Sequence, residues 1–205
     1  MNPNFSDGVD SLYRDANILV LLSLAIALSP EDSSLKSAAP GLIAAGRKLA
    51  EVQNLDEAKA AAEEVKNAVA STADTSSLRW EKTVHLSPLM KKGLPNITTE
   101  IKRLGRNEKT LSRSGNLDKV VGATATLTVI AVGCRPNVDE TLAPTEEAQW
   151  LEYCDRLYDA SLELNKAAAA FRDKTGSFDD FSAAFKAVDA TCNTTCHASF
   201  GGTTN

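Results

Sequence analysis

The chain is poor in aromatic residues, histidine and methionine. Of its 205 residues, 5% are aromatic, two are histidine and two are methionine. Few aromatic side chains, together with many alanines and leucines, favour helices over sheets. Two histidines leave little room for acid–base catalysis, and no glycine-rich phosphate loop or nucleophile motif is found. The net charge of −5 argues against a nucleic acid as partner. These absences favour an all-α protein that is not an enzyme.

The main apolar run is too short to cross a bilayer. It extends from Ile18 to Leu28, which is eleven residues, whereas a helical span needs about 20. This length is also typical of the apolar part of a signal peptide. However, three aspartates precede it and only Arg14 is positive. We therefore expect a buried helix over residues 8–28 and no membrane span, with a signal or anchor as the alternative.

Helix-start signals follow this run. Ser29 with Pro30 predicts the N-terminus of a second helix, and Pro40 predicts a kink or restart in it. Asn54 with Glu57 predicts a capping box that opens a third helix.

Similar signals return in the last third of the chain. Residues 118–134 are rich in Val, Thr and Ile, which periodicity alone does not distinguish from a strand. Because no partner strand is visible elsewhere, we expect a helix. Pro144 opens a long helix that ends near Arg172, and Ser177 with Asp180 opens the last helix. One face of the long helix is expected to carry Leu151, Cys154, Tyr158 and Ser161.

Between these parts, residues 74–115 are basic and are broken by Ser, Gly and Pro. We expect a long irregular connection with short helices near 86–92 and 97–105, and long connections are often functional. Its positive side chains would pair with an anionic ligand, dock an acidic partner protein, or form a solvated face. They are Lys91, Lys92, Lys102, Arg103, Arg106, Lys109 and Arg113.

A faint repeat suggests how the chain is organised. The stretches 60–76 and 182–199 share a spacing of Ala, Lys and Val, although chance would also explain it. If the similarity is a true repeat, residues 1–73 and 116–205 would be two related three-helix halves. The expected fold is an up-and-down helical bundle of about six or seven helices.

The most specific motif, CNTTCH, lies near the C-terminus. Two cysteines, Cys192 and Cys196, are followed directly by His197. Haem is attached through C-x-x-C-H, in which both thiols bond to the porphyrin and the histidine binds the iron. Here the spacing is one residue longer, C-x-x-x-C-H. Three apolar residues precede the thiols at helical spacing, namely Phe181, Phe185 and Val188.

Residues 178–198 resemble the last helix of the cytochrome c-prime-like (class II c-type) cytochromes, and the likeness extends loosely to residue 142. Those proteins are helical bundles with the haem motif at the end of the chain. The resemblance implies one covalent haem c, attached through Cys192 and Cys196 with His197 as the proximal ligand. Phe181 and Phe185 would line its pocket. This chain departs from the family in its greater length, its longer motif and the lack of a sixth ligand in an early helix.

The same resemblance implies electron transfer or binding of a small gas. It also implies a redox partner protein and export to the bacterial periplasm, for which this chain shows no leader, and it leaves the oligomeric state open. The positive side chains of the middle segment would then pair with the haem propionates or dock the acidic redox partner. Met90 is the candidate sixth iron ligand, because a thioether raises the reduction potential; alternatively it fills a gap in the core. His85 is a weaker candidate and is expected at the surface.

Two other interpretations of the motif stay open. Cys192, Cys196 and His197 would bind zinc if a fourth ligand such as His85 joined them. Alternatively, the chain is a structural or interaction bundle with a Cys192–Cys196 disulfide. The remaining cysteines, Cys134 and Cys154, are expected as buried thiols, with a disulfide between them as the alternative.

Overall fold

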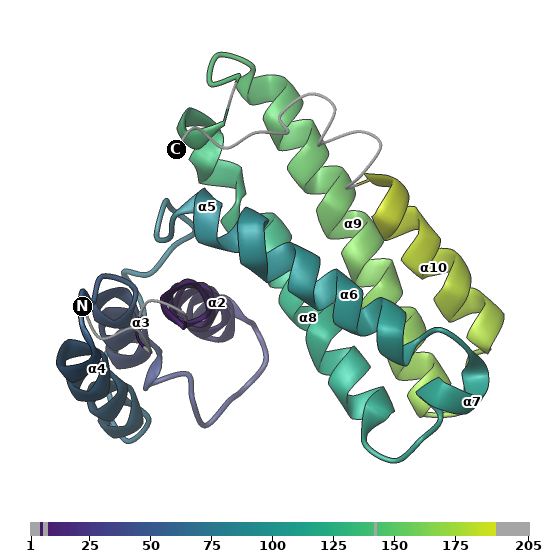
Figure 1. The fold of residues 1–205 in the computed structure, drawn as a ribbon, viewed down its shortest axis with the longest axis horizontal. Helices are drawn as coiled ribbons and strands as arrows, with labels where there is room; N and C mark the ends of the chain where they lie inside the picture. Colours follow the sequence, from purple (N-terminus) through teal and green to yellow (C-terminus); the bar gives the residue numbers. More distant parts are fainter. Residues whose placement is uncertain (1–4, 6–7, 142, 192–205) are drawn as a thin grey trace. The chain divides into compact units, whose positions relative to one another are not determined.

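The computed structural model describes residues 5, 8–141 and 143–191, and every regular element in these ranges is a helix (Figure 1). The expected all-α helical bundle is confirmed. Seven of the described helices have eleven or more residues, in keeping with the expected six or seven. The chain forms two compact units, Met1–Gly93 and Leu94–Asn205. The boundary falls inside the basic segment that we expected to be a connection.

Three successive helices build most of the first unit, and the middle one packs against both others. A close approach joins the first two, because a Cβ at Gly46 would lie only 2.8 Å from the Val20 Cγ2 atom. The three helices are α2 (Val9–Leu28), α3 (Ala39–Leu49) and α4 (Leu55–Ala68).

Among the described residues, α2 is the one helix long and apolar enough to cross a membrane by length and composition alone. Core helices and signal sequences have the same properties. In this structure α2 packs against α3 and buries two polar side chains, Asn17 and Ser23. Ser23 Oγ donates to the Leu19 carbonyl at 2.8 Å, so a backbone acceptor within the helix satisfies this hydroxyl.

The predicted helix start at Ser29 and Pro30 is wrong. Residues 29–38 form turns, and α3 begins at Ala39 with Pro40 in its first turn. The Ser29 hydroxyl accepts from the Glu31 N–H at 3.1 Å, and the Ser33 hydroxyl accepts from the Leu35 N–H at 3.2 Å. Such side-chain bonds compete with the helical ladder. Of the two alternatives predicted for Pro40, a kink or a restart, the structure shows the restart.

The predicted cap of α4 is confirmed, with one difference in the capping box. Asn54 Oδ1 accepts from the N–H groups of Asp56 and Glu57 at 3.1 and 3.0 Å. In a capping box the Glu57 carboxylate would accept from the Asn54 N–H. Instead it accepts from the N–H of Gln53 at 2.7 Å and from the Asn54 side-chain amide at 2.7 Å.

Two short elements end the first unit, and both pack against α2. They are α5 (Leu86–Pro88) and the π-helix η1 (Leu89–Gly93), which together account for the short helix expected near 86–92. The second expected short helix is α6 (Leu94–Leu104), which belongs to the second unit.

Four long helices dominate the second unit. The helix α8 packs against α6 and α9, and α9 packs against α10 (Figure 1). The stretch rich in Val, Thr and Ile is helical, as expected, and lies in α8. The elements of this unit after α6 are α7 (Glu108–Leu111), α8 (Asn116–Gly133), η2 (Arg135–Glu140), α9 (Glu147–Arg172) and α10 (Phe178–Ala190).

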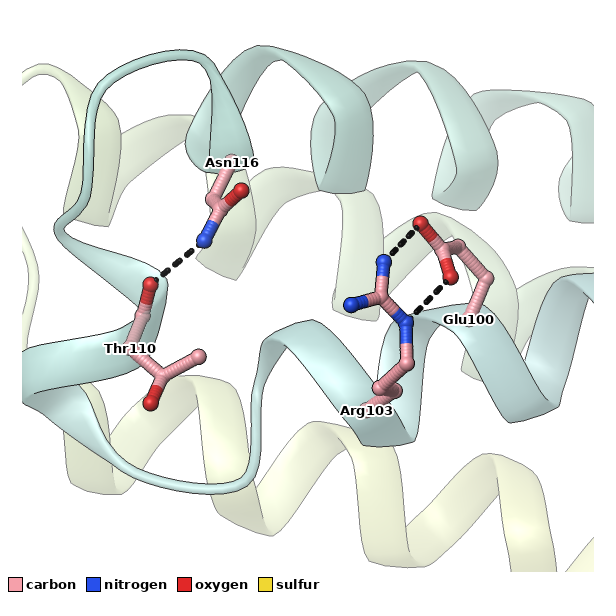
Figure 2. A network of polar contacts seen from close by, with 4 residues as sticks. All are labelled: Glu100, Arg103, Thr110 and Asn116. Carbon is pink, nitrogen blue, oxygen red and sulfur yellow. Dashed lines mark hydrogen bonds and ion pairs between the residues drawn. The ribbon is translucent and has the colours of Figure 1, made fainter.

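Polar contacts stabilise the last turns of α6 and join α7 to α8. Arg103 forms a bidentate ion pair with Glu100 at 2.8 and 2.7 Å, and the Asn116 side-chain amide donates to the Thr110 carbonyl at 2.7 Å (Figure 2). Because Arg103 donates to it, the pKa of Glu100 is lowered from its ordinary value.

The buried face of α9 differs partly from the expected one. Cys154 and Ser161 are buried as expected, but Leu151 and Tyr158 are only half-buried. The buried stripe instead follows a spacing of four and three residues, which is the seam of packed helices. It consists of Trp150, Cys154, Leu157, Ser161, Leu164 and Ala168.

Candidate functional site

The helix α10 leads directly to the CNTTCH motif. Its start is fixed by the predicted capping box: the Ser177 hydroxyl accepts from the Asp180 N–H at 3.1 Å, and the Asp180 carboxylate accepts from the Ser177 N–H at 3.1 Å. The Ser177 hydroxyl also donates to that carboxylate at 2.6 Å. These bonds, the hydroxyl bond above all, lower the pKa of Asp180.

The apolar stripe of α10 faces the core of the second unit. Phe181 and Val188 are fully buried, and Phe185 is half-buried. The helix packs against α9, to which a short loop joins it. The apolar spacing along α10 therefore marks a buried face as far as Val188, whereas the lining of a haem pocket by Phe181 and Phe185 stays a prediction.

Phe181 is a packing residue at the start of this stripe. A Cβ at Gly105, just after α6, would lie 2.5 Å from Phe181 Cε1, so the ring sits on the glycine. The Phe178 ring centroid lies 6.2 Å from that of Phe181 and 6.3 Å from that of Phe171. Phe181 precedes Val188 by seven residues, roughly 10 Å along the helix axis, so it lies at the end of α10 opposite the motif.

The residues of the motif itself, Cys192, Cys196 and His197, lie outside the described residues. Within the described part of the chain, three or more His, Cys, Asp or Glu side chains do not gather into a group that could hold a metal ion. The haem attachment, the zinc site and the Cys192–Cys196 disulfide therefore all stay predictions.

The two candidate ligands from the middle segment belong to the first unit. Met90 lies in η1 and is half-buried, and His85 precedes α5 with an exposed side chain. The His85 N–H donates to the Asn17 side-chain oxygen at 3.3 Å. The exposed position of His85 agrees with expectation, and the role of Met90 stays a prediction.

Cys134 and Cys154 are both buried and both remain thiols. They lie on the hairpin of α8 and α9, which Trp150 ties together by donating its indole N–H to the carbonyls of Cys134 and Arg135 at 3.1 Å each. Arg135 also forms an ion pair with Asp155. The default expectation, a pair of buried thiols, holds in this structure.

The fit to a haem can be judged from the core beside α10. The core of the second unit is mainly apolar, and the Ser161 hydroxyl of α9 is buried in it without a hydrogen-bond partner. Small side chains recur along α9 in the run Ala167–Ala170. An apolar, helical frame is compatible with a haem, and Met90 stays the candidate for a further iron ligand.

Sequence reasoning missed Gly105 and Trp150. Gly105 follows the last turn of α6, and a glycine is common at the end of a helix. The sequence around it therefore gives no sign that the Phe181 ring packs against it. The expected buried face of α9 began at Leu151; a face that began one residue earlier would have included Trp150.

Comparison with family models, with curated proteins and with solved structures finds no match to this chain.

Proposed function

We propose that this chain is a c-type cytochrome that carries one haem c and serves electron transfer or the binding of a small gas. Cys192 and Cys196 form the thioether links and His197 is the proximal iron ligand. The observation that supports the proposal best is the register of α10. Its buried face passes through Phe181 and Val188, and the same helical spacing counted along the sequence reaches both cysteines.

Haem attachment needs no oxidant. Each thiol adds across one vinyl group of the porphyrin, so that the sulfur bonds to one vinyl carbon and the hydrogen goes to the other. When bound, the haem supplies a reversible one-electron centre. The protein contributes a helical frame and an apolar surround, which tune the potential through burial and ligand identity.

Exposed positive side chains are the proposed docking surface for an acidic redox partner. In the second unit, Lys102, Arg106, Lys109 and Arg113 are exposed. Arg103 contributes less because Glu100 pairs with it. Since the chain as a whole has a net charge of −5, this cationic segment is distinct from its surroundings. Reduction by an acidic partner is expected to slow as ionic strength rises.

The decisive experiment is a pyridine haemochrome spectrum of protein exported through a secretory leader in cells with haem-maturation machinery. We expect a c-type band that survives acid extraction and that disappears in the double variant C192A and C196A. The matched control is C154A, which removes a cysteine in the core of α9 and should keep the covalent haem.

Absence of covalent haem under these conditions would contradict the proposal. Thiol titration and metal analysis of the same preparation would then identify the remaining alternatives, a Cys192–Cys196 disulfide or bound zinc. Deleting Thr195 restores the ordinary C-x-x-C-H spacing. If only the deletion variant takes up haem, the longer spacing prevents attachment in the native chain.

A further inference from the structure

A pocket of about 420 Å³ lies within the first unit, in the range of roughly 300–1,000 Å³ that suits small ligands. Three elements line it: α2, the C-terminal end of α3, and the irregular segment before α5. Its apolar lining comes from Val20, Ala50 and Val84.

The segment 82–85 forms a wall of this pocket and is fixed to α2 by a buried amide. The Asn17 side chain is 4% exposed. Its oxygen accepts from the His85 N–H at 3.3 Å, while its nitrogen donates to the Tyr13 carbonyl at 2.7 Å. The pocket wall is thus part of the packed unit.

Two polar groups that line the pocket have no partner in the described part of the chain. Thr83 Oγ1 is buried and makes no hydrogen bond, which is a costly state for a hydroxyl. Arg47 forms no ion pair there, although the adjacent Lys48 pairs with Glu64 at 2.7 Å. A hydroxyl donor and a guanidinium on one pocket are the groups that recognise a carboxylate.

We propose that this pocket binds a small organic monocarboxylate with a short hydrocarbon chain. The Arg47 guanidinium binds the carboxylate, the Thr83 hydroxyl donates to it, and the valines contact the hydrocarbon. Lys82 adds a second positive charge at the same pocket. Glu51 also lines it and would repel a second carboxylate, which favours a monocarboxylate over a dicarboxylate. The proposal does not depend on the haem.

The test is calorimetric titration of the full-length chain with sodium butyrate, with butyramide as the uncharged ligand of the same shape. We expect butyrate to bind and butyramide to bind at least tenfold more weakly, because the charge-assisted bonds to Arg47 are lost. R47Q should weaken butyrate binding by about tenfold or more. The control R79Q changes an exposed arginine of the same unit that does not line the pocket and should bind as the parent does.

Substitution of Thr83 gives a second test, because it should affect the stability of the free protein and the affinity for butyrate in opposite directions. T83V removes the unsatisfied hydroxyl, so the ligand-free melting temperature should stay the same or rise, while butyrate binds more weakly. T83S should restore binding. The proposal is overturned if butyrate does not bind at millimolar concentration, if butyramide binds equally well, or if inorganic phosphate binds through Arg47 and butyrate does not.

Discussion

The helices α4, in the first unit, and α10, in the second, are held in different ways. In the first unit, α4 buries only two alanines, Ala58 and Ala61. In the second unit, α10 buries Phe181 and Val188 and half-buries Phe185. Since the free energy of burial grows with the apolar area removed from water, α10 is anchored more strongly than α4.

The polar contacts do not make up this difference. The ion pair that joins α4 to α3, Lys48 with Glu64, has both side chains about half exposed, and such pairs contribute about 0–1 kcal/mol. The stretches 60–76 and 182–199 share a spacing pattern, but their described helices, α4 and α10, are packed differently. A firmly held α10 would suit the proposed haem attachment at its end, whereas we expect α4 to open locally more readily.

The largest expected effect comes from removing the anchor of α10. F181A should lower the free energy of unfolding by about 3–5 kcal/mol, because a fully buried ring leaves a cavity. F178A, which removes a half-buried ring of the same cluster, should cost clearly less. Urea unfolding of both variants measures the difference, and equal losses would show that Phe181 is not the anchor.

Substitutions at two glycines test the contact between Gly105 and the Phe181 ring. G105A should destabilise the protein by about 1–3 kcal/mol through overpacking, because the new Cβ would lie 2.5 Å from the Phe181 ring and 2.9 Å from the Ile101 carbonyl oxygen. G122A lies in α8 with nothing within 4 Å of its Cβ. It should stabilise by up to about 1 kcal/mol through helix propensity. If both variants have the same stability, the contact between Gly105 and Phe181 is loose.

Removing the N-caps compares the two helices directly. S177A and N54A should each cost about 1 kcal/mol, since each removes acceptors of the first-turn N–H groups. The consequences should differ. Hydrogen exchange is expected to accelerate throughout α4 in N54A but only in the first turn of α10 in S177A, because α10 is held by its buried ring. Uniform acceleration along α10 would contradict the comparison.

The features that local chemistry determines could be predicted from the sequence. The caps at Asn54 and Ser177, the long helix after Pro144 and the inward stripe of α10 all depend on residues close together in the chain. The start at Ser29 failed for a local reason too, because serine side chains formed turns instead of a cap.

The features that depend on tertiary contacts could not be predicted. The seating of Phe181 on Gly105, the inclusion of α6 in the second unit, and the pocket that joins Asn17, Arg47 and Thr83 involve residues far apart in sequence. The candidate haem residues were found from a contiguous motif, which needs no fold to be recognised. For the same reason, the motif alone does not say how its residues are arranged.

The smallest expected effect is a pH dependence at the start of α10. The Ser177 hydroxyl and N–H groups lower the pKa of Asp180, so the folded protein binds this proton less readily than the unfolded chain does. The stabilisation is therefore fully present above the ordinary carboxyl pKa and is lost as the pH falls through the lowered value. In S177A the Asp180 carboxyl, followed by NMR, should titrate at a higher pH than in the parent. Because D180N lacks the ionisable group, its stability should change less than that of the parent over the same acid range. An unchanged Asp180 titration in S177A would show that the capping hydroxyl does not set this pKa, and the start of α10 would then owe its order to the buried ring alone.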